Sequence, residues 1–241
     1  MSAARLQTTD RDLVLSAETL SSCRQEAHLD LDHIQLAARD APLIIPWPSP
    51  GLTGGMIQFN EPDEWRRFIV GLGIDARIPD IVQLKFRRAQ TLYLLGWIDL
   101  DLLKAGELAA LIALELTVMD RYGDLIPKKK RSFAALLKHM VDVDGLEDAH
   151  IPIIVRTGGT AIGFVTGASE PSLSQRRNGM AHGDPFDGLP VGGLLELVRD
   201  LINYAYRDFI ANTLLGTVRL SWPDRKRERL SSPSTTPAFL R

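Results

Sequence analysis

The chain has little cysteine, no excess of either charge and no long apolar run. Its 241 residues include one cysteine, Cys23, so no disulfide can form within the chain and no zinc site built on two thiolates is available. Lys and Arg total 28 against 30 Asp and Glu, which gives a net charge of -2 and excludes a general positive coat for nonspecific nucleic-acid binding. Apolar stretches such as 108–114 are too short to cross a bilayer. We therefore expect a soluble cytoplasmic protein that makes no contact with a membrane.

Common enzyme signatures are also missing. The sequence contains no P-loop, no Gly-x-Gly-x-x-Gly after a strand and no Gly-x-Ser-x-Gly motif. The glycine-rich Gly158-Gly159-Thr160 has no lysine partner, and such stretches are more often turns than phosphate cradles. None of the five histidines is spaced with carboxylates in the way that metal ligands are. We therefore predict no metal site and no cofactor.

Three regions differ in composition. Residues 1–75 are predicted to form an N-terminal extension of mixed or irregular structure, in which 10–39 fits either a helix or a strand. Residues 76–220 have regular helical periodicity and are predicted to form one helical domain. Residues 221–241 are basic and then rich in Ser, Thr and Pro, which predicts a flexible tail. Within the extension, four prolines exclude a continuous helix and predict an extended connector: Pro42, Pro46, Pro48 and Pro50.

Apolar residues at helical spacing dominate the middle of the chain. Met56–Phe59 is predicted to be a short strand, and the glycine-rich 157–167 a loop or hairpin. Ser132 and Ser172 are predicted N-caps, and Pro190 precedes the last helix. The predicted helices span 61–72, 81–97, 101–122, a segment after Ser132, a segment from Ser172 to His182, and a segment that carries Leu195, Val198, Ile202, Ala205 and Phe209.

The helix predicted over 101–122 is expected to lie at the centre of the domain, because it is the most apolar. The last five helices are joined by connections that alternate between short and longer, which predicts an antiparallel bundle. The fold class is therefore all-α, with an added N-terminal extension. The expected core stripe of the central helix consists of Ala105, Ala109, Ile112, Leu116 and Met119, widened by Leu111, Leu114 and Val118.

One segment near the end of the fourth bundle helix concentrates polar groups. Residues 175–183 read Gln-Arg-Arg-Asn-Gly-Met-Ala-His-Gly. Asn178 and His182 are four residues apart and so share a helix face, and the long side chain of Arg177 can reach over from the side. Histidine is the side chain best suited to proton transfer near neutral pH. An ordinary surface helix that ends in a histidine would produce the same short pattern.

The string Arg177-Asn178-x-x-x-His182-Gly183 resembles the signature of the HEPN superfamily, the higher eukaryote and prokaryote nucleotide-binding domains. That signature is an arginine, usually followed by a polar residue, with a histidine after four to six intervening residues.

Two further segments support the resemblance. Residues 109–116 are similar to the central helix of the family, which often carries a glutamate, here Glu115. Residues 132–137 resemble the third helix of the family. The resemblance covers roughly 76–216 and does not include the N-terminal third.

The resemblance implies a helical bundle that forms a homodimer through its motif helices and, in many members, cleaves RNA without a metal. The RNA 2′-hydroxyl attacks the adjacent phosphorus, which leaves a 2′,3′-cyclic phosphate and a free 5′-hydroxyl. In this reaction His182 would be the general base or acid, Arg177 would hold the non-bridging oxygens, and Asn178 would orient the histidine or contact the substrate. Because one histidine cannot be base and acid in a single step, a two-fold dimer would supply the second.

The resemblance also suggests RNA-binding residues and partners. Arg176 would add electrostatic attraction for phosphates, as would the basic run Lys128, Lys129, Lys130 and Arg131, although a solvated loop explains that run equally well. A neutralising protein partner and a role in defence or stress response fit the same interpretation. Two alternatives stay open: a noncatalytic HEPN module that binds a nucleotide, RNA or a partner protein, and an unrelated helical protein with a chance motif.

Overall fold

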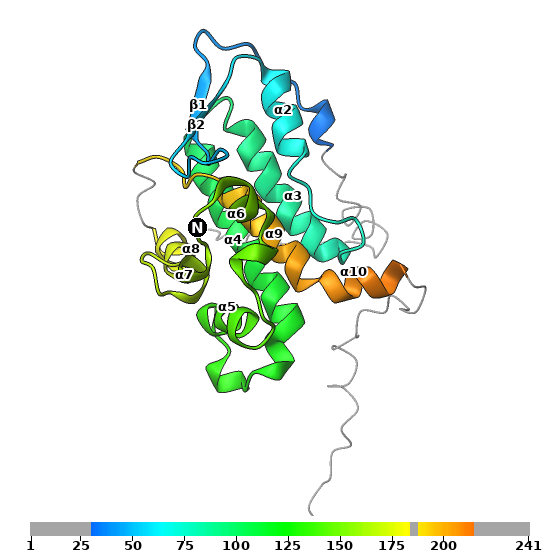
Figure 1. The fold of residues 1–241 in the computed structure, drawn as a ribbon. Helices are drawn as coiled ribbons and strands as arrows, with labels where there is room; N and C mark the ends of the chain where they lie inside the picture. Colours follow the sequence, from blue (N-terminus) through cyan, green and yellow to red (C-terminus); the bar gives the residue numbers. More distant parts are fainter. Residues whose placement is uncertain (1–29, 184–187, 215–241) are drawn as a thin grey trace, which may run out of the picture.

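The computed structural model describes residues 30–183 and 188–214, which are mostly helical and carry one two-stranded sheet (Figure 1). The largely helical character agrees with the periodicity of the sequence. Residues 1–29 of the extension and the tail predicted over 221–241 lie outside the described residues. In the described ranges, no helix is both long enough and apolar enough to cross a membrane.

The elements follow one another with short connections. The strands are β1 (Leu43–Pro46) and β2 (Met56–Phe59). The helices are α2 (Pro62–Val70), α3 (Asp80–Leu95), α4 (Asp101–Tyr122), α5 (Phe133–Asp142), α6 (Pro152–Thr157), α7 (Ile162–Thr166), α8 (Leu173–Ala181), α9 (Leu194–Ala205) and α10 (Arg207–Leu214). Short 3-10 turns lie at Leu31–His33, Gly123–Leu125, Lys128–Lys130 and Asp148–His150.

The N-terminal extension packs onto the helices and shares their core. Strands β1 and β2 form an antiparallel hairpin in which Leu43 pairs with Phe59. The Phe59 ring lies 5.0 Å from the ring of Trp65 in α2, and Trp65 is fully buried. The indole N–H of Trp47, just after β1, donates to Glu196 in α9 at 3.1 Å. These contacts join the hairpin to helices from both halves of the chain.

Helix α4 lies at the centre of the fold, between α3, α5, α8 and α9 (Figure 1). Its approach to α3 is close because Gly106 has no side chain. A Cβ atom at Gly106 would lie 2.6 Å from Cδ2 of Tyr93, which is closer than atoms can pack. The aromatic ring of α3 therefore fills the space that any other residue at position 106 would occupy.

The five residues predicted as the core stripe of α4 are wrong, whereas the three predicted to widen it, Leu111, Leu114 and Val118, are fully buried. Ile112 and Met119 are 40% and 36% exposed, and Ala105, Ala109 and Leu116 are only partly buried. The fully buried face instead contains Leu103, Ala110, Leu111, Ala113, Leu114 and Val118. Because the helix is apolar on nearly all sides, its periodicity does not predict the buried face, which is determined by the neighbouring helices.

Two other boundaries differ from the sequence prediction. The segment 157–167, predicted to be a loop or hairpin, contains the short helix α7. The last predicted helix is divided into α9 and α10 at Tyr206, which is buried and donates its hydroxyl to Asp120 at 2.8 Å. Both differences arise from contacts between distant parts of the chain, which local periodicity does not contain.

Candidate functional site

Helix α8 carries the motif, and its ends are defined by local contacts. At its start the Ser172 hydroxyl accepts from the Gln175 amide at 3.3 Å, and the Gln175 side chain accepts from the Ser172 amide at 2.6 Å. This reciprocal capping satisfies two amides that the first helical turn leaves without partners. At its end the His182 amide donates to the Asn178 carbonyl at 3.0 Å, and Gly183 follows with a φ of +88°. The helix thus starts and ends where the sequence predicts.

Arg177 is the best-connected residue of the motif. Its Nη2 lies 2.6 Å from Oε2 of Glu115 in α4, and both side chains are 28% exposed. Its Nη1 donates to Oδ1 of Asn178 at 3.1 Å. The guanidinium is therefore held between a carboxylate and an amide, in a fixed orientation at the surface. Glu115, the glutamate of the central helix, is in direct contact with the motif.

His182 lies at the exposed C-terminal end of α8. It is one helical turn beyond Asn178 and on the same side of the helix, whereas Arg177 is five residues away, about 140° around the axis. Within the described chain, no contact joins the side chains of Arg177 and His182. A single protomer therefore presents the guanidinium toward α4 and the imidazole toward solvent, with Asn178 adjacent to both.

Arg176, the residue before Arg177, contacts α7 rather than Glu115. Its guanidinium carbon lies 5.3 Å from the centre of the Phe164 ring in α7, at the distance of a cation–π contact. It also interacts electrostatically with the buried carboxylate of Glu107 in α4. Arg176 therefore contributes to packing between α7, α8 and α4 as well as to local positive charge.

Unpaired polar atoms gather around this helix. In the part of the chain that the structure describes, three buried side-chain atoms have no hydrogen-bond partner: the Tyr93 hydroxyl, Nε of Arg176 and Nε of Arg177. Unpaired buried polar atoms are rare in native proteins, and each requires an explanation such as a functional role. Two of the three are on the motif helix α8, and the third is on α3, where the Tyr93 ring lies against Gly106 of α4.

The predicted basic run lies at a different end of α4. Lys128, Lys129 and Lys130 form an exposed 3-10 turn that follows the C-terminus of α4. Arg131 is turned inward, where its Nε donates to the Ile126 carbonyl at 3.1 Å and its Nη2 lies 3.5 Å from Asp124. The three lysines are therefore exposed, whereas the contacts of Arg131 stabilise the loop.

Apolar side chains border the Arg177–Glu115 pair. Ile112 precedes Glu115 by three residues and Met119 follows it by four, so all three share one face of α4. We call Ile112, Leu116 and Met119 the α4 apolar stripe, of which Ile112 and Met119 are 40% and 36% exposed. These apolar side chains lie beside the Arg177–Glu115 pair on the surface of α4.

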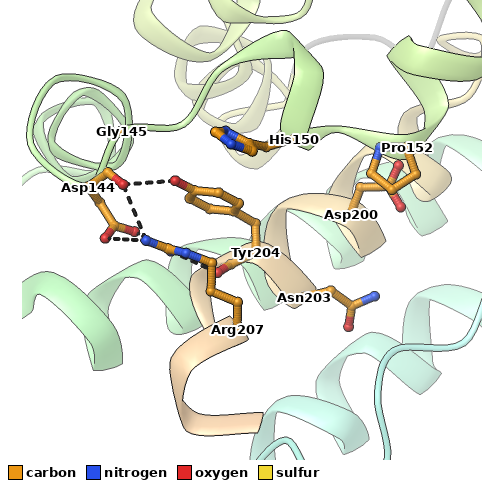
Figure 2. Close-up of a pocket in the computed structure, with 8 residues that line it drawn as sticks. All are labelled: Asp144, Gly145, His150, Pro152, Asp200, Asn203, Tyr204 and Arg207. Carbon is orange, nitrogen blue, oxygen red and sulfur yellow. Dashed lines mark hydrogen bonds and ion pairs between the residues drawn. The ribbon is translucent and has the colours of Figure 1, made fainter. Parts of the chain in front are cut away.

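A cavity of about 490 Å³ lies between the end of α5 and helices α9 and α10 (Figure 2). Asp144 accepts hydrogen bonds at one edge of it. Arg207 donates to both carboxylate oxygens of Asp144, at 2.7 and 2.8 Å, and Tyr122 donates to one of them at 2.7 Å. Burial raises the pKa of Asp144, but the Arg207 and Tyr122 hydrogen bonds and the charges of Arg207 and Arg121 outweigh it and hold that pKa below its usual value.

Tyr204 contacts a guanidinium and a second ring in this cavity. The guanidinium carbon of Arg207 lies 4.0 Å from the centre of the Tyr204 ring. The centres of the His150 and Tyr204 rings are 5.5 Å apart, and the two ring planes are tilted by 35°. Tyr204 also donates its hydroxyl to the Asp144 carbonyl at 2.8 Å. Figure 2 shows Tyr204 in the centre of this group, between His150 and Arg207. The cavity thus lies where the end of α5 meets α9 and α10, and most of its polar groups hydrogen-bond to one another. We call this contact the Asp144 joint.

Local sequence patterns do not predict this joint, because the residues that form it are far apart in the chain. Asp144 and Arg207 are separated by 63 residues. An aspartate before a glycine, as in Asp144-Gly145, indicates only a turn. No local signal identifies Arg207 as its partner.

The glycine-rich segment Gly158-Gly159-Thr160 lines a second cavity of about 310 Å³. The other walls come from the turn after β1 and from the start of α9, including Thr53 and Gly193. No lysine or arginine is among its lining residues, so the cavity lacks the cation that usually accompanies a phosphate cradle.

Over 30–183 and 188–214, no group of three or more His, Cys, Asp and Glu side chains is arranged to hold a metal ion. Comparisons of the chain with models of known families, with curated proteins and with solved structures find no match. Function is therefore argued from the motif and its surroundings alone.

Proposed function

We propose that the protein is a metal-independent endoribonuclease of HEPN type that acts as a homodimer. The proposal starts from the resemblance of the motif in α8 to the HEPN signature. The observation that carries it is the contact of Arg177 with both Glu115 and Asn178, which fixes a guanidinium next to the helix face that bears His182. An oriented guanidinium suits the stabilisation of a phosphorane, and a solvent-accessible imidazole suits proton transfer.

Two protomers would complete the site. In one protomer Arg177 and His182 are on different sides of α8, and one imidazole cannot both remove and supply a proton in the same step. The α4 apolar stripe lies beside the Arg177–Glu115 pair and has exposed side chains that a second copy would cover. A two-fold axis near this stripe would bring two α8 helices together, and with them two histidines.

RNA cleavage in EDTA tests the proposal. Purified protein is incubated with total RNA, and the ends of the products are examined. We expect 2′,3′-cyclic phosphate and 5′-hydroxyl ends, with cleavage lost in His182→Ala and in Arg177→Ala. Lys138→Ala, which removes an exposed cation that pairs with Asp142 on α5, is the matched control and should retain activity. Cleavage that persists in both motif variants, or that requires a divalent metal, would contradict the proposal.

A noncatalytic HEPN module is the second candidate. It is favoured by the separation of Arg177 from His182 in one protomer and by the carboxylate that already occupies the guanidinium. Such a module would bind RNA, a nucleotide or a partner protein without cleaving it. The two functions differ in one measurement: the module would bind RNA with an affinity that depends on Arg177, and the RNA would be recovered intact.

A further inference from the structure

Glu107 is a buried acidic residue in the middle of the fold. It lies on α4, is 1% exposed, and its Oε2 is 3.5 Å from Nζ of Lys104. Its Oε1 accepts a hydrogen bond from the backbone amide of Val191. Burial raises the pKa of Glu107, and the charges of Lys104 and Arg176 and the Val191 amide act against that rise. A buried carboxylate with several donors is costly to disturb, because removing it leaves those donors unpaired.

Glu107 accepts a hydrogen bond from Val191 and lies within reach of the charge of Arg176, although no ion pair within 4 Å joins the Arg176 and Glu107 side chains in the described residues. Arg176 is on α8, immediately before Arg177. Val191 lies three residues before the start of α9. One carboxylate on α4 therefore interacts with the chain on each side of the residues that carry the proposed chemistry.

The surroundings of Glu107 leave little room for movement. The neighbouring Gly106 is in close contact with the ring of Tyr93, so α3 is fixed against this turn of α4. Burial and then the charge of Glu107 raise the pKa of the Tyr93 hydroxyl, and the Leu195 amide acts in the opposite sense. That hydroxyl has no hydrogen-bond partner of good geometry within the described chain. Glu107 thus lies on a rigid support, as a residue that orients another element must.

We propose that Glu107 is a positioning residue, which fixes α8 and the following segment against α4 and so sets the placement of Arg177 and His182. The position follows from the hydrogen bond that Val191 donates to Glu107 and from the nearby charge of Arg176. Its catalytic consequence rests on the proposed ribonuclease function.

Backbone amide exchange measured by NMR on the full chain tests the position directly. In Glu107→Ala the Val191 amide loses its acceptor, and we expect it to exchange about tenfold faster, with a smaller acceleration across α8. Glu107→Gln keeps an oxygen acceptor but removes the charge. In that variant Val191 should stay protected, while the α8 amides near Arg176 exchange faster than in the unmodified protein.

Glu196→Gln is the matched control. Glu196 is another buried carboxylate, 6% exposed, which pairs with Arg156 and Arg199 and accepts from Trp47, away from α8. Its substitution should leave the exchange of Val191 and α8 unchanged relative to the rest of the chain. The positioning role is overturned if Val191 exchanges at the same rate in Glu107→Ala, or if α8 responds no more to Glu107→Gln than to Glu196→Gln. If Glu107→Ala does not fold, the comparison of the two glutamine variants decides the matter.

RNA cleavage by the same variants separates the two proposals. We expect Glu107→Gln to lower kcat by about tenfold or more at a nearly constant KM, because a shift of about 1 Å in a catalytic group is sufficient for such a loss. If the unmodified protein cleaves no RNA, the ribonuclease function fails while the exchange data still decide the role of Glu107. If cleavage occurs but Glu107→Gln leaves kcat unchanged, the positioning role fails and the function stands.

Discussion

Glu115 and Arg177 meet across the contact between α4 and α8, with 2.6 Å between their nearest oxygen and nitrogen atoms. The pair connects the central helix to the motif helix at the protein surface. A carboxylate in this place resembles a phosphate oxygen in charge and in hydrogen-bonding capacity. In the proposed ribonuclease, the guanidinium would therefore be oriented toward an anion before RNA binds.

The energy of this pair is expected to be small. Both side chains are partly exposed, and such ion pairs contribute about 0.2–1 kcal/mol to the free energy of unfolding. We predict a coupling energy in this range from urea unfolding of Glu115→Ala, Arg177→Ala and the double variant. Arg177→Ala should accordingly remain folded, so that a loss of RNA cleavage in this variant reports on chemistry. A coupling energy of several kcal/mol would show that Arg177 is mainly structural.

The α4 apolar stripe gives a prediction about self-association. Ile112→Asp and Met119→Asp place a charge where a second copy would exclude water, and each should convert a dimer into a monomer. Size-exclusion chromatography with light scattering measures the change. Val143→Asp is the control, because Val143 is 70% exposed at the end of α5. An unmodified protein that is monomeric at high concentration, or stripe variants that remain dimeric, would argue against this surface.

The Asp144 joint predicts a dependence of stability on pH. The pKa of Asp144 is lowered from 3.8 in the folded state, so its contribution to stability is present above about pH 4 and is lost as the pH falls through the folded-state value. Asp144→Asn should lower the free energy of unfolding by about 1–3 kcal/mol at pH 7, and the difference should narrow toward pH 3.

Urea unfolding at both pH values measures this effect. Asp142→Asn is the matched control, since Asp142 is 48% exposed and pairs only with Lys138 across one helical turn. Its substitution should change stability little at either pH. A difference for Asp144→Asn that is equally large at pH 3 and pH 7 would exclude the ionised carboxylate as the cause.

The contact of Gly106 with Tyr93 predicts a loss of stability on adding one methyl group. Alanine is the better helix former, yet its Cβ at position 106 would lie 2.6 Å from the Tyr93 ring. We expect Gly106→Ala to destabilise the fold by about 1–3 kcal/mol, as overpacking of a core does. Gly54→Ala, with no atom within 4 Å of the added Cβ, should be nearly neutral. Thermal unfolding of both variants measures the difference. Equal melting temperatures for the two variants would contradict the close contact.

Local signals in the sequence were sufficient for the ends of several helices. Helix α4 spans the predicted 101–122, and Ser132 and Ser172 are N-caps whose side chains accept from the amides of Ala135 and Gln175. These features depend on residues within one or two helical turns of each other, which periodicity and capping rules describe well.

Such local signals do not predict contacts between residues that are distant in the sequence. The buried face of α4 is selected by α3 and α9, and Glu107 meets Val191 across 84 residues. The proposed site has the same division. The motif and Glu115 can be recognised in the sequence, whereas the contact of Glu115 with Arg177 and the contact of Glu107 with Val191 are found only in the structure.

The hydrogen bond between Trp47 and Glu196 joins residues 149 positions apart. During synthesis the hairpin therefore leaves the ribosome long before its partner helix α9 exists. The buried apolar residues of the hairpin, such as Leu43 and Ile45, therefore cannot be fully buried on this side of the core until the last quarter of the chain has been synthesised. Nascent chains that stop before α9 should consequently leave this apolar surface exposed and be prone to aggregate.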